Sequence, residues 1–122
     1  MNVKRINMFL WYKYDFSIFE NRIANKIKIS DFLVSDNKCT HRLIGLRYDH
    51  KTMSEPEITI ICNRDEMAVA KKIAFDFGKK IYHKTDLSAQ LIKMYYISRK
   101  VEPPLYKEIA VLYSKYFHGK RY

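Results

Sequence analysis

Apolar residues in the first third of the chain change their spacing near residue 31. Before that point, four of them recur at intervals of 3, 4 and 4 positions, namely Phe16, Phe19, Ile23 and Ile27. This spacing places them on one face of a helix. Asp15 or Ser17 can cap such a helix. The pattern therefore predicts a helix over residues 15–29 that ends before Ser30.

Residues 31–62 have the pattern of short strands. Three apolar segments are separated by polar stretches and lie at 32–34, 43–48 and 58–61. The last of them is rich in β-branched residues, as buried strands are. Residues 35–38 have the composition of a turn, and the proline-containing stretch 49–56 has that of a loop. We therefore predict three consecutive strands in this region.

A second helix is predicted to begin at Asn63. Asn63 is a preferred N-cap residue, and Glu66 three positions later completes the pattern of a capping box. Gly78 is suited to end the helix. The expected apolar face consists of Ala70, Ile73, Ala74 and Phe77.

The remaining sequence predicts one short strand and two helices. The strand covers residues 81–83, and Thr85 is expected to cap the helix that follows. Two prolines at positions 103 and 104 open the last helix, where the first turn tolerates proline, and Gly119 lies just past its end. The apolar positions of the two helices are Leu87, Leu91 and Ile92, and then Leu105, Ile109, Leu112 and Tyr116.

This order of elements predicts an α/β (α+β) fold. We expect a small four-stranded mixed sheet with helices packed around it, preceded by an N-terminal helix. The strand–helix–strand unit at 57–83 is expected to be a right-handed parallel crossover. The length of 122 residues suits one such domain.

The composition adds a strong positive charge. The formal net charge is +10, with 23 Lys and Arg against 13 Asp and Glu. A surplus of this size indicates an acidic partner, a membrane surface or a nucleic acid. It is equally consistent with a lysine-rich composition that has no specific partner, because the charges are spread along the chain.

Residues typical of catalysis are not arranged in a recognisable site. The sequence contains no phosphate-binding glycine loop and no nucleophile elbow, and its four histidines are scattered. Cys39 and Cys62 have no partner at zinc-site spacing. We therefore predict no metal and no cofactor. No apolar run approaches the ~18 residues of a membrane span, so we expect the chain as given to be soluble and cytoplasmic.

Nucleic-acid binding is the main alternative that composition allows. Aromatic residues can stack on bases while basic side chains contact phosphates. No known nucleic-acid-binding motif is present, however, and apolar residues at helical spacing are more often core. The residues concerned lie near the N-terminus and are Lys4, Arg5, Trp11, Tyr12, Lys13, Tyr14 and Phe16.

Residues 41–117 can be aligned without a gap to a known family. The matching segments are His-Arg-Leu-Ile-Gly-Leu-Arg-Tyr-Asp at 41–49, Met-Ser-Glu-Pro at 53–56, the helix start at 64–74, Leu-Ser-Ala-Gln-Leu at 87–91 and Val-Glu-Pro-Pro-Leu-Tyr-Lys-Glu-Ile-Ala at 101–110. In this order and spacing they resemble the cytoplasmic domain of the FlhB/YscU/SpaS family. These proteins are the substrate-specificity switches of type III secretion export apparatuses, flagellar or injectisome.

The resemblance implies a non-enzymatic docking domain. Residues 31–122 would form the switch domain, and residues 1–30 would be a helical extension or linker. The implied partners are export substrates, a ruler protein and export-gate proteins, with no nucleic acid. The implied location is the cytoplasm at the inner-membrane face of the apparatus, with membrane contact only through an N-terminal part that this chain lacks.

The family's self-cleavage motif is altered here. In the family motif Asn-Pro-Thr-His, the asparagine amide nitrogen attacks its own backbone carbonyl, and the proline side leaves. The aligned residues are Lys38, Cys39, Thr40 and His41. Lysine has no side-chain amide, so we predict that this cleavage does not occur. A register shift that makes Asn37 the nucleophile is an alternative, as is attack by the Cys39 thiolate.

The family's substrate-docking patch can be carried over by position. It falls on Glu55, Pro56, Ala110 and Tyr113. Pro56 and Ala110 suit a small apolar depression. Glu55 stands where the family has alanine, and Tyr113 is larger than the usual leucine. Ala110 is also compatible with a purely structural role as a close-packing helix residue.

Overall fold

The computed structural model describes residues 14–36, 42–98 and 101–119, with side chains from residue 21 onward. Two short 3₁₀ turns, Arg64–Glu66 and Pro103–Leu105, precede the second and fourth helices. The elements are, in chain order, α1 (Tyr14–Ile29), β2 (Phe32–Asp36), β3 (Arg42–Arg47), β4 (Glu57–Cys62), α2 (Met67–Asp76), β5 (Ile81–His83), α3 (Thr85–Ser98) and α4 (Tyr106–Gly119). This order confirms the predicted α+β fold.

The four described strands form one mixed sheet in the order β4-β3-β2-β5. The strands β2, β3 and β4 are joined as antiparallel neighbours, whereas β5 pairs with β2 in parallel. β4 and β5 consequently run in the same direction, as predicted for the strand–helix–strand unit. They are not neighbours, because the chain crosses β3 and β2 before β5 joins the sheet.

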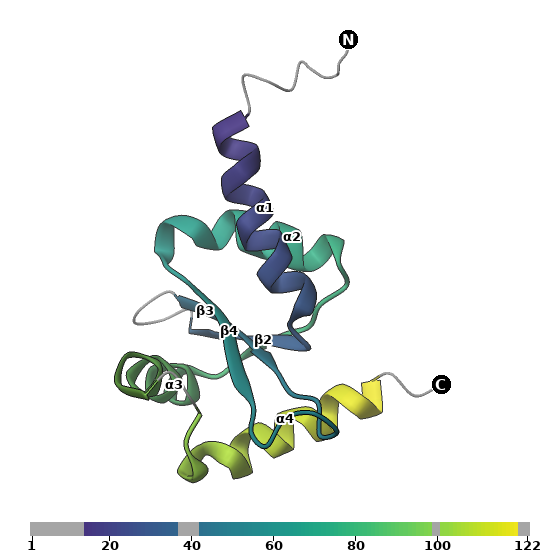
Figure 1. The fold of residues 1–122 in the computed structure, drawn as a ribbon, viewed down its shortest axis with the longest axis vertical. Helices are drawn as coiled ribbons and strands as arrows, with labels where there is room; N and C mark the ends of the chain where they lie inside the picture. Colours follow the sequence, from purple (N-terminus) through teal and green to yellow (C-terminus); the bar gives the residue numbers. More distant parts are fainter. Residues whose placement is uncertain (1–13, 37–41, 99–100, 120–122) are drawn as a thin grey trace.

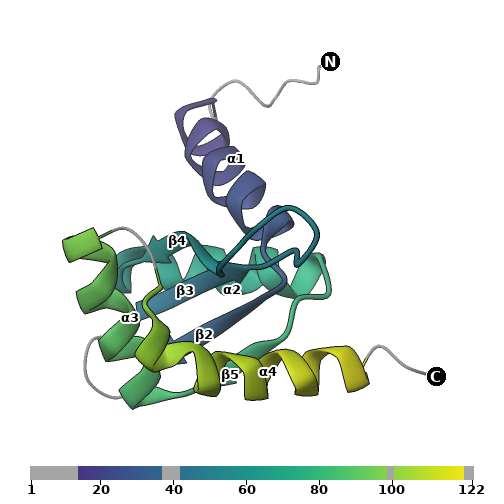
Figure 2. The same ribbon diagram turned by 60° about the horizontal axis from the view of Figure 1, so that its bottom comes forward.

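The helices cover the sheet in two layers. α1 and α2 lie on one face, and α3 and α4 lie on the other (Figures 1 and 2). Side chains alternate between the faces along each strand. In β2, Phe32 and Val34 pack toward α3 and α4, whereas Leu33 packs toward α1 and α2. The sheet therefore has a buried core on each side.

The predicted capping box forms at the 3₁₀ turn Arg64–Glu66, which leads into α2. The Glu66 N–H donates to Asn63 Oδ1 at 3.0 Å, and the Asn63 N–H donates to Glu66 Oε1 at 2.9 Å, which is a complete capping box. At the other end Gly78 adopts a φ of 67°. The prediction that Phe77 belongs to the buried face was wrong. The helix ends at Asp76, so Phe77 leaves the apolar stripe and is 44% exposed.

The C-terminal half of α1 is part of the folded core. Ile23 and Ile27 are buried among residues of α2 and the sheet. Where α1 ends, Ser30 Oγ donates to the Lys26 carbonyl and hydrogen-bonds Thr59 Oγ1 above Gly45. A Cβ at Gly45 would collide with both hydroxyls, so glycine is required there. The division of the chain at residue 30 stays a prediction.

In the described ranges, no helix is long and apolar enough to span a lipid bilayer.

Candidate functional site

The altered cleavage motif lies between two paired strands. Residues 37–41, which include Asn37, Lys38, Cys39, Thr40 and His41, are outside the described residues. Their flanks are defined, since Asp36 and Arg42 form the last pair of the β2–β3 hairpin. The predicted turn at 35–38 began too early. Ser35 and Asp36 belong to β2 and are fully buried, because the hairpin pairing continues through them.

A pocket of about 440 Å³ lies beside α4. One face of α4 supplies most of its wall. Successive turns of the helix place Tyr106, Ile109, Ala110, Tyr113, Ser114 and Phe117 along it. Most of these side chains are apolar or aromatic, and Ala110 is exposed at the surface of the pocket. We call this hollow the docking pocket.

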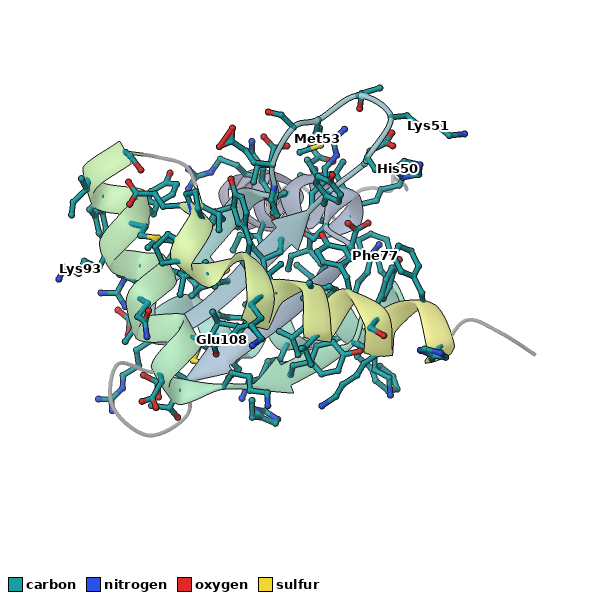
Figure 3. The ribbon with its side chains drawn as sticks, turned by 90° about the horizontal axis from the view of Figure 1, so that it is seen from below. His50, Lys51, Met53, Phe77, Lys93 and Glu108 are labelled. Atoms are coloured by element: carbon teal, nitrogen blue, oxygen red, sulfur yellow. The ribbon has the colours of Figure 1, made fainter. Side chains whose placement is uncertain are left out.

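The loop between β3 and β4 forms the opposite wall. Tyr48, Ser54 and Pro56 line the docking pocket from this side. Figure 3 shows the loop, with His50, Lys51 and Met53 labelled, on the side of the molecule that carries α4. Segments about fifty residues apart in the sequence thus meet at one hollow.

Three of the four residues in the predicted docking patch come together in this pocket. Pro56, Ala110 and Tyr113 line it, whereas Glu55 is not part of its wall. Glu55 is half-buried at the neighbouring loop position. Burial raises the pKa of Tyr106, and the charge of Glu55 raises it further, which places this carboxylate near the Tyr106 ring. Glu55 therefore adds negative charge near the pocket.

Tyr113 is a structural residue as well as a wall of the pocket. It is only 6% exposed, and its hydroxyl donates to Asp31 Oδ2 at 2.7 Å. The same oxygen accepts the Tyr48 backbone N–H at 2.8 Å. Burial and the hydrogen bond to Asp31 raise the pKa of Tyr113 well above its usual value of 10.0. The phenol therefore stays protonated and ties α4 to the ends of β2 and β3.

The described walls of the pocket combine apolar and polar surface. Its walls offer apolar surface, aromatic edges and two serine hydroxyls. Within the part of the chain that the structure describes, no group of three or more His, Cys, Asp or Glu side chains could hold a metal ion. Cys62 is buried elsewhere in the core, where burial and the nearby Glu66 raise the pKa of its thiol to about 12. This thiol stays protonated at neutral pH.

Sequence reasoning missed several residues of the pocket, among them Tyr48, Tyr106, Ser114 and Phe117. A signal for the α4 residues was present. The spacing of Tyr106, Ala110, Tyr113 and Phe117 is 4, 3 and 4, which describes a second apolar stripe beside the core stripe. Tyr48 carried no such signal, because its position depends on where β3 ends. The residues of the nucleic-acid alternative lie outside the described side chains.

Comparison with known proteins gives structural neighbours only. The chain is similar to a crystal structure of a variant EscU C-terminal domain, with a TM-score of 0.70 and 22% identity over 79% of this chain and 86% of that one. It is also similar to the cytoplasmic domain of FlhB from Shewanella putrefaciens, with a TM-score of 0.68 and 16% identity over 79% of this chain and 75% of that one. No family model and no curated protein matches the chain.

A further EscU variant, with alanine in place of a proline, has a TM-score of 0.62 and 19% identity over 74% of this chain and 87% of that one. At these identities the likeness shows the fold. The chain has the fold of the EscU and FlhB cytoplasmic domains, which is the fold that the sequence resemblance implied.

Proposed function

We propose that this chain is a substrate-docking domain of the FlhB/YscU type in a type III secretion export apparatus, flagellar or injectisome. It binds export substrates, a ruler protein and gate components at the cytoplasmic, inner-membrane face of the apparatus. It acts by binding its partners and does not undergo the self-cleavage that is typical of the family.

The observation that carries this proposal is the agreement between two independent lines. The sequence resemblance selects four residues from distant parts of the chain, of which Glu55 lies beside the pocket and the others are Pro56, Ala110 and Tyr113. The structure gathers the same three residues around one apolar pocket. The fold supports the proposal too, because the structural neighbours are EscU and FlhB cytoplasmic domains.

The pocket is suited to one apolar side chain of a partner. Ala110 is small and exposed, which leaves room between the rings of Tyr106 and Phe117. Burial of a leucine- or phenylalanine-sized side chain there contributes about 1.5–3 kcal/mol. Such a contribution supports weak, reversible docking, which suits a domain that releases each substrate.

A binding titration tests the docking claim. Rod, needle or hook subunits from the same organism are titrated by calorimetry against the wild-type domain and against Ala110→Glu. We expect Ala110→Glu to weaken binding by at least about tenfold, because it fills the pocket and buries a charge. Ala89→Glu is the matched control, since Ala89 is an exposed alanine on α3 outside the pocket. Equal weakening by both variants, or none by Ala110→Glu, contradicts the proposal.

Intact mass under denaturing conditions tests the silent motif. We expect the wild-type chain to remain a single species of 14.7 kDa. The double variant Lys38→Asn/Cys39→Pro restores the amide nucleophile and the proline leaving side, and we expect it to split between positions 38 and 39. Cleavage of the wild-type chain at 37–39 contradicts the proposal that Lys38 silences the motif. An intact double variant contradicts the chemistry assigned to it.

A further inference from the structure

A second hollow lies on the other side of α4. Its volume is about 610 Å³, and it shares no wall residue with the docking pocket. It opens between the turn that joins α2 to β5 and the C-terminal half of α4, where Figure 3 shows Phe77 beside the helix. Its walls combine aromatic and basic side chains, among them Phe75, Phe77, Lys80, Tyr82, Lys115 and Tyr116. We call this hollow the basic groove.

Two lysines in the wall of the groove have no carboxylate partner among the described residues. Lys80 and Lys115 are both exposed, and neither forms an ion pair with a carboxylate of the described residues. The only carboxylate among the described wall residues is that of Asp31, and its Oδ2 already accepts two hydrogen bonds from the protein. The groove therefore presents net positive charge.

Two exposed phenylalanines form the apolar part of the groove. Phe75 is 82% exposed and Phe77 is 44% exposed, although both are large apolar side chains. They lie two positions apart where α2 ends, and Gly78 then turns the chain with a φ of 67°. A concentrated exposed apolar patch on a soluble domain marks an interaction site more often than chance.

The floor of the groove is rigid. Tyr82 and Tyr116 both pack on the buried ring of Phe32, with ring centroids 5.3 Å and 5.6 Å away. These two rings therefore join the wall of the groove to the buried core.

We propose that the basic groove binds an acidic peptide segment that carries an aromatic or aliphatic side chain between its carboxylates. The carboxylates pair with Lys80 and Lys115, and the apolar side chain covers Phe77 and Phe75. This combination matches each exposed feature of the groove with one chemical group of the partner. The proposal does not depend on what the docking pocket binds.

Two other anionic partners fit the groove less well. A nucleic-acid strand is held by a basic surface that follows its backbone over several nucleotides, whereas two exposed lysines, Lys80 and Lys115, lie in the described wall of the groove. A membrane presents a broad surface, which cannot enter a hollow between two segments and therefore cannot contact the walls of the groove.

Fluorescence anisotropy with a labelled peptide, Glu-Glu-Phe-Leu-Glu-Glu, tests the proposal on the full chain. We expect Lys80→Glu/Lys115→Glu to weaken binding by at least about tenfold. The matched control is Lys71→Glu/Lys93→Glu, which changes the net charge equally at exposed lysines outside the groove. Lys93 lies on α3, well away from Phe77 in Figure 3. We expect the control to weaken binding by less than about threefold.

Two further arms decide the class of partner. Phe75→Ser/Phe77→Ser is expected to weaken binding by about fivefold, and circular dichroism checks that its fold is kept. Ala110→Glu is expected to leave the affinity for this peptide unchanged, which separates the groove from the docking pocket. An equal loss of peptide affinity in the two lysine double variants overturns the proposal. So does the absence of wild-type binding at peptide concentrations up to about 1 mM. Tighter binding of a single-stranded RNA or of phosphatidylserine vesicles, lost with the same two lysines, overturns it as well.

Discussion

The two hollows beside α4 have different chemistry although a single helix separates them. The docking pocket is lined by tyrosines, Pro56 and Ala110, and none of its described wall residues is charged. The basic groove contains three lysines and exposed phenylalanines. Neighbouring positions of α4 divide between them, since Ser114 faces the pocket and Lys115 faces the groove. One helix can thus serve two surfaces with different partners.

The two hollows nevertheless share their support. Phe32 is fully buried beneath α4 and contacts Tyr113 of the pocket as well as Tyr82 and Tyr116 of the groove. The hydrogen bond from Tyr113 to Asp31 joins a wall of one hollow to a wall of the other. The two hollows differ in the chemistry of their walls but rest on the same buried residues. Substitutions of Phe32, Tyr113 or Asp31 are therefore expected to affect both hollows.

The largest effect is expected from removal of the shared ring. Phe32→Ala leaves a cavity beneath both hollows and is expected to lower the free energy of unfolding by about 3–5 kcal/mol. Urea denaturation measures this loss. Phe75→Ala is the matched control, because Phe75 is 82% exposed and its removal is expected to change stability by less than about 0.5 kcal/mol. Equal losses of unfolding free energy for the two substitutions contradict the claim that Phe32 supports both hollows.

The next effect comes from the hydrogen bonds that join the hollows. Asp31→Ala removes the acceptor of two donors and is expected to cost about 2–3 kcal/mol of stability. Tyr113→Phe removes one donor and is expected to cost about 1 kcal/mol, since Asp31 keeps the Tyr48 N–H. Chemical denaturation at neutral pH compares them. A larger loss for Tyr113→Phe than for Asp31→Ala contradicts the assignment of Asp31 as the common acceptor.

Alkaline pH gives an independent test of the same bond. The pKa of Tyr113 is raised above 10.0 in the folded state by burial and by Asp31. The native state therefore keeps this proton when the unfolded state loses it, so the stabilisation is complete below pH 10 and declines above it. Between pH 10 and about pH 11, wild type is expected to lose about 1 kcal/mol more than Tyr113→Phe. Parallel pH profiles of the two proteins contradict the raised pKa.

The smallest effect expected is the difference in salt dependence between the hollows. Binding of the acidic peptide at the basic groove is expected to weaken several-fold as sodium chloride rises from about 0.05 M to about 0.5 M, because exposed charges are screened. Substrate binding at the docking pocket is expected to change by less than about twofold, because apolar burial carries it. If the affinities of both ligands fall equally with salt concentration, the proposed chemical difference between the two hollows is contradicted.

Local sequence features, namely apolar periodicity and helix-capping residues, predicted most of the fold. The spacing of Ile23 and Ile27, the Asn63–Glu66 capping box and Gly78 each depend on local physical chemistry, and the structure contains all three features. The local pattern wrongly placed Phe77 on the buried face of α2. The helix ends at Asp76, one residue earlier than predicted, so the Phe77 side chain leaves the apolar stripe. It also placed the turn after β2 too early, because strand pairing overrides the turn preference of Ser35 and Asp36.

The two hollows could be predicted only in part. The second stripe of α4 is visible in the sequence, and the family resemblance adds Pro56 from a distant loop. The basic groove was not predicted, because it forms where the α2–β5 turn meets α4. Its lysines come from segments more than thirty residues apart, and nothing local relates Lys80 to Lys115. Such sites depend on packing between elements.

The most direct test of the central claim is a two-dimensional NMR titration of the full chain with each ligand in turn. Export subunits are expected to shift the backbone amide signals of Ile109, Ala110 and Phe117 and to leave those of Lys80 and Phe77 in place. The acidic peptide is expected to shift Phe77, Lys80 and Lys115 and to leave Ala110 in place. Shifts of one common set by both ligands, or of neither hollow by the subunits, would contradict a docking domain with two separate surfaces.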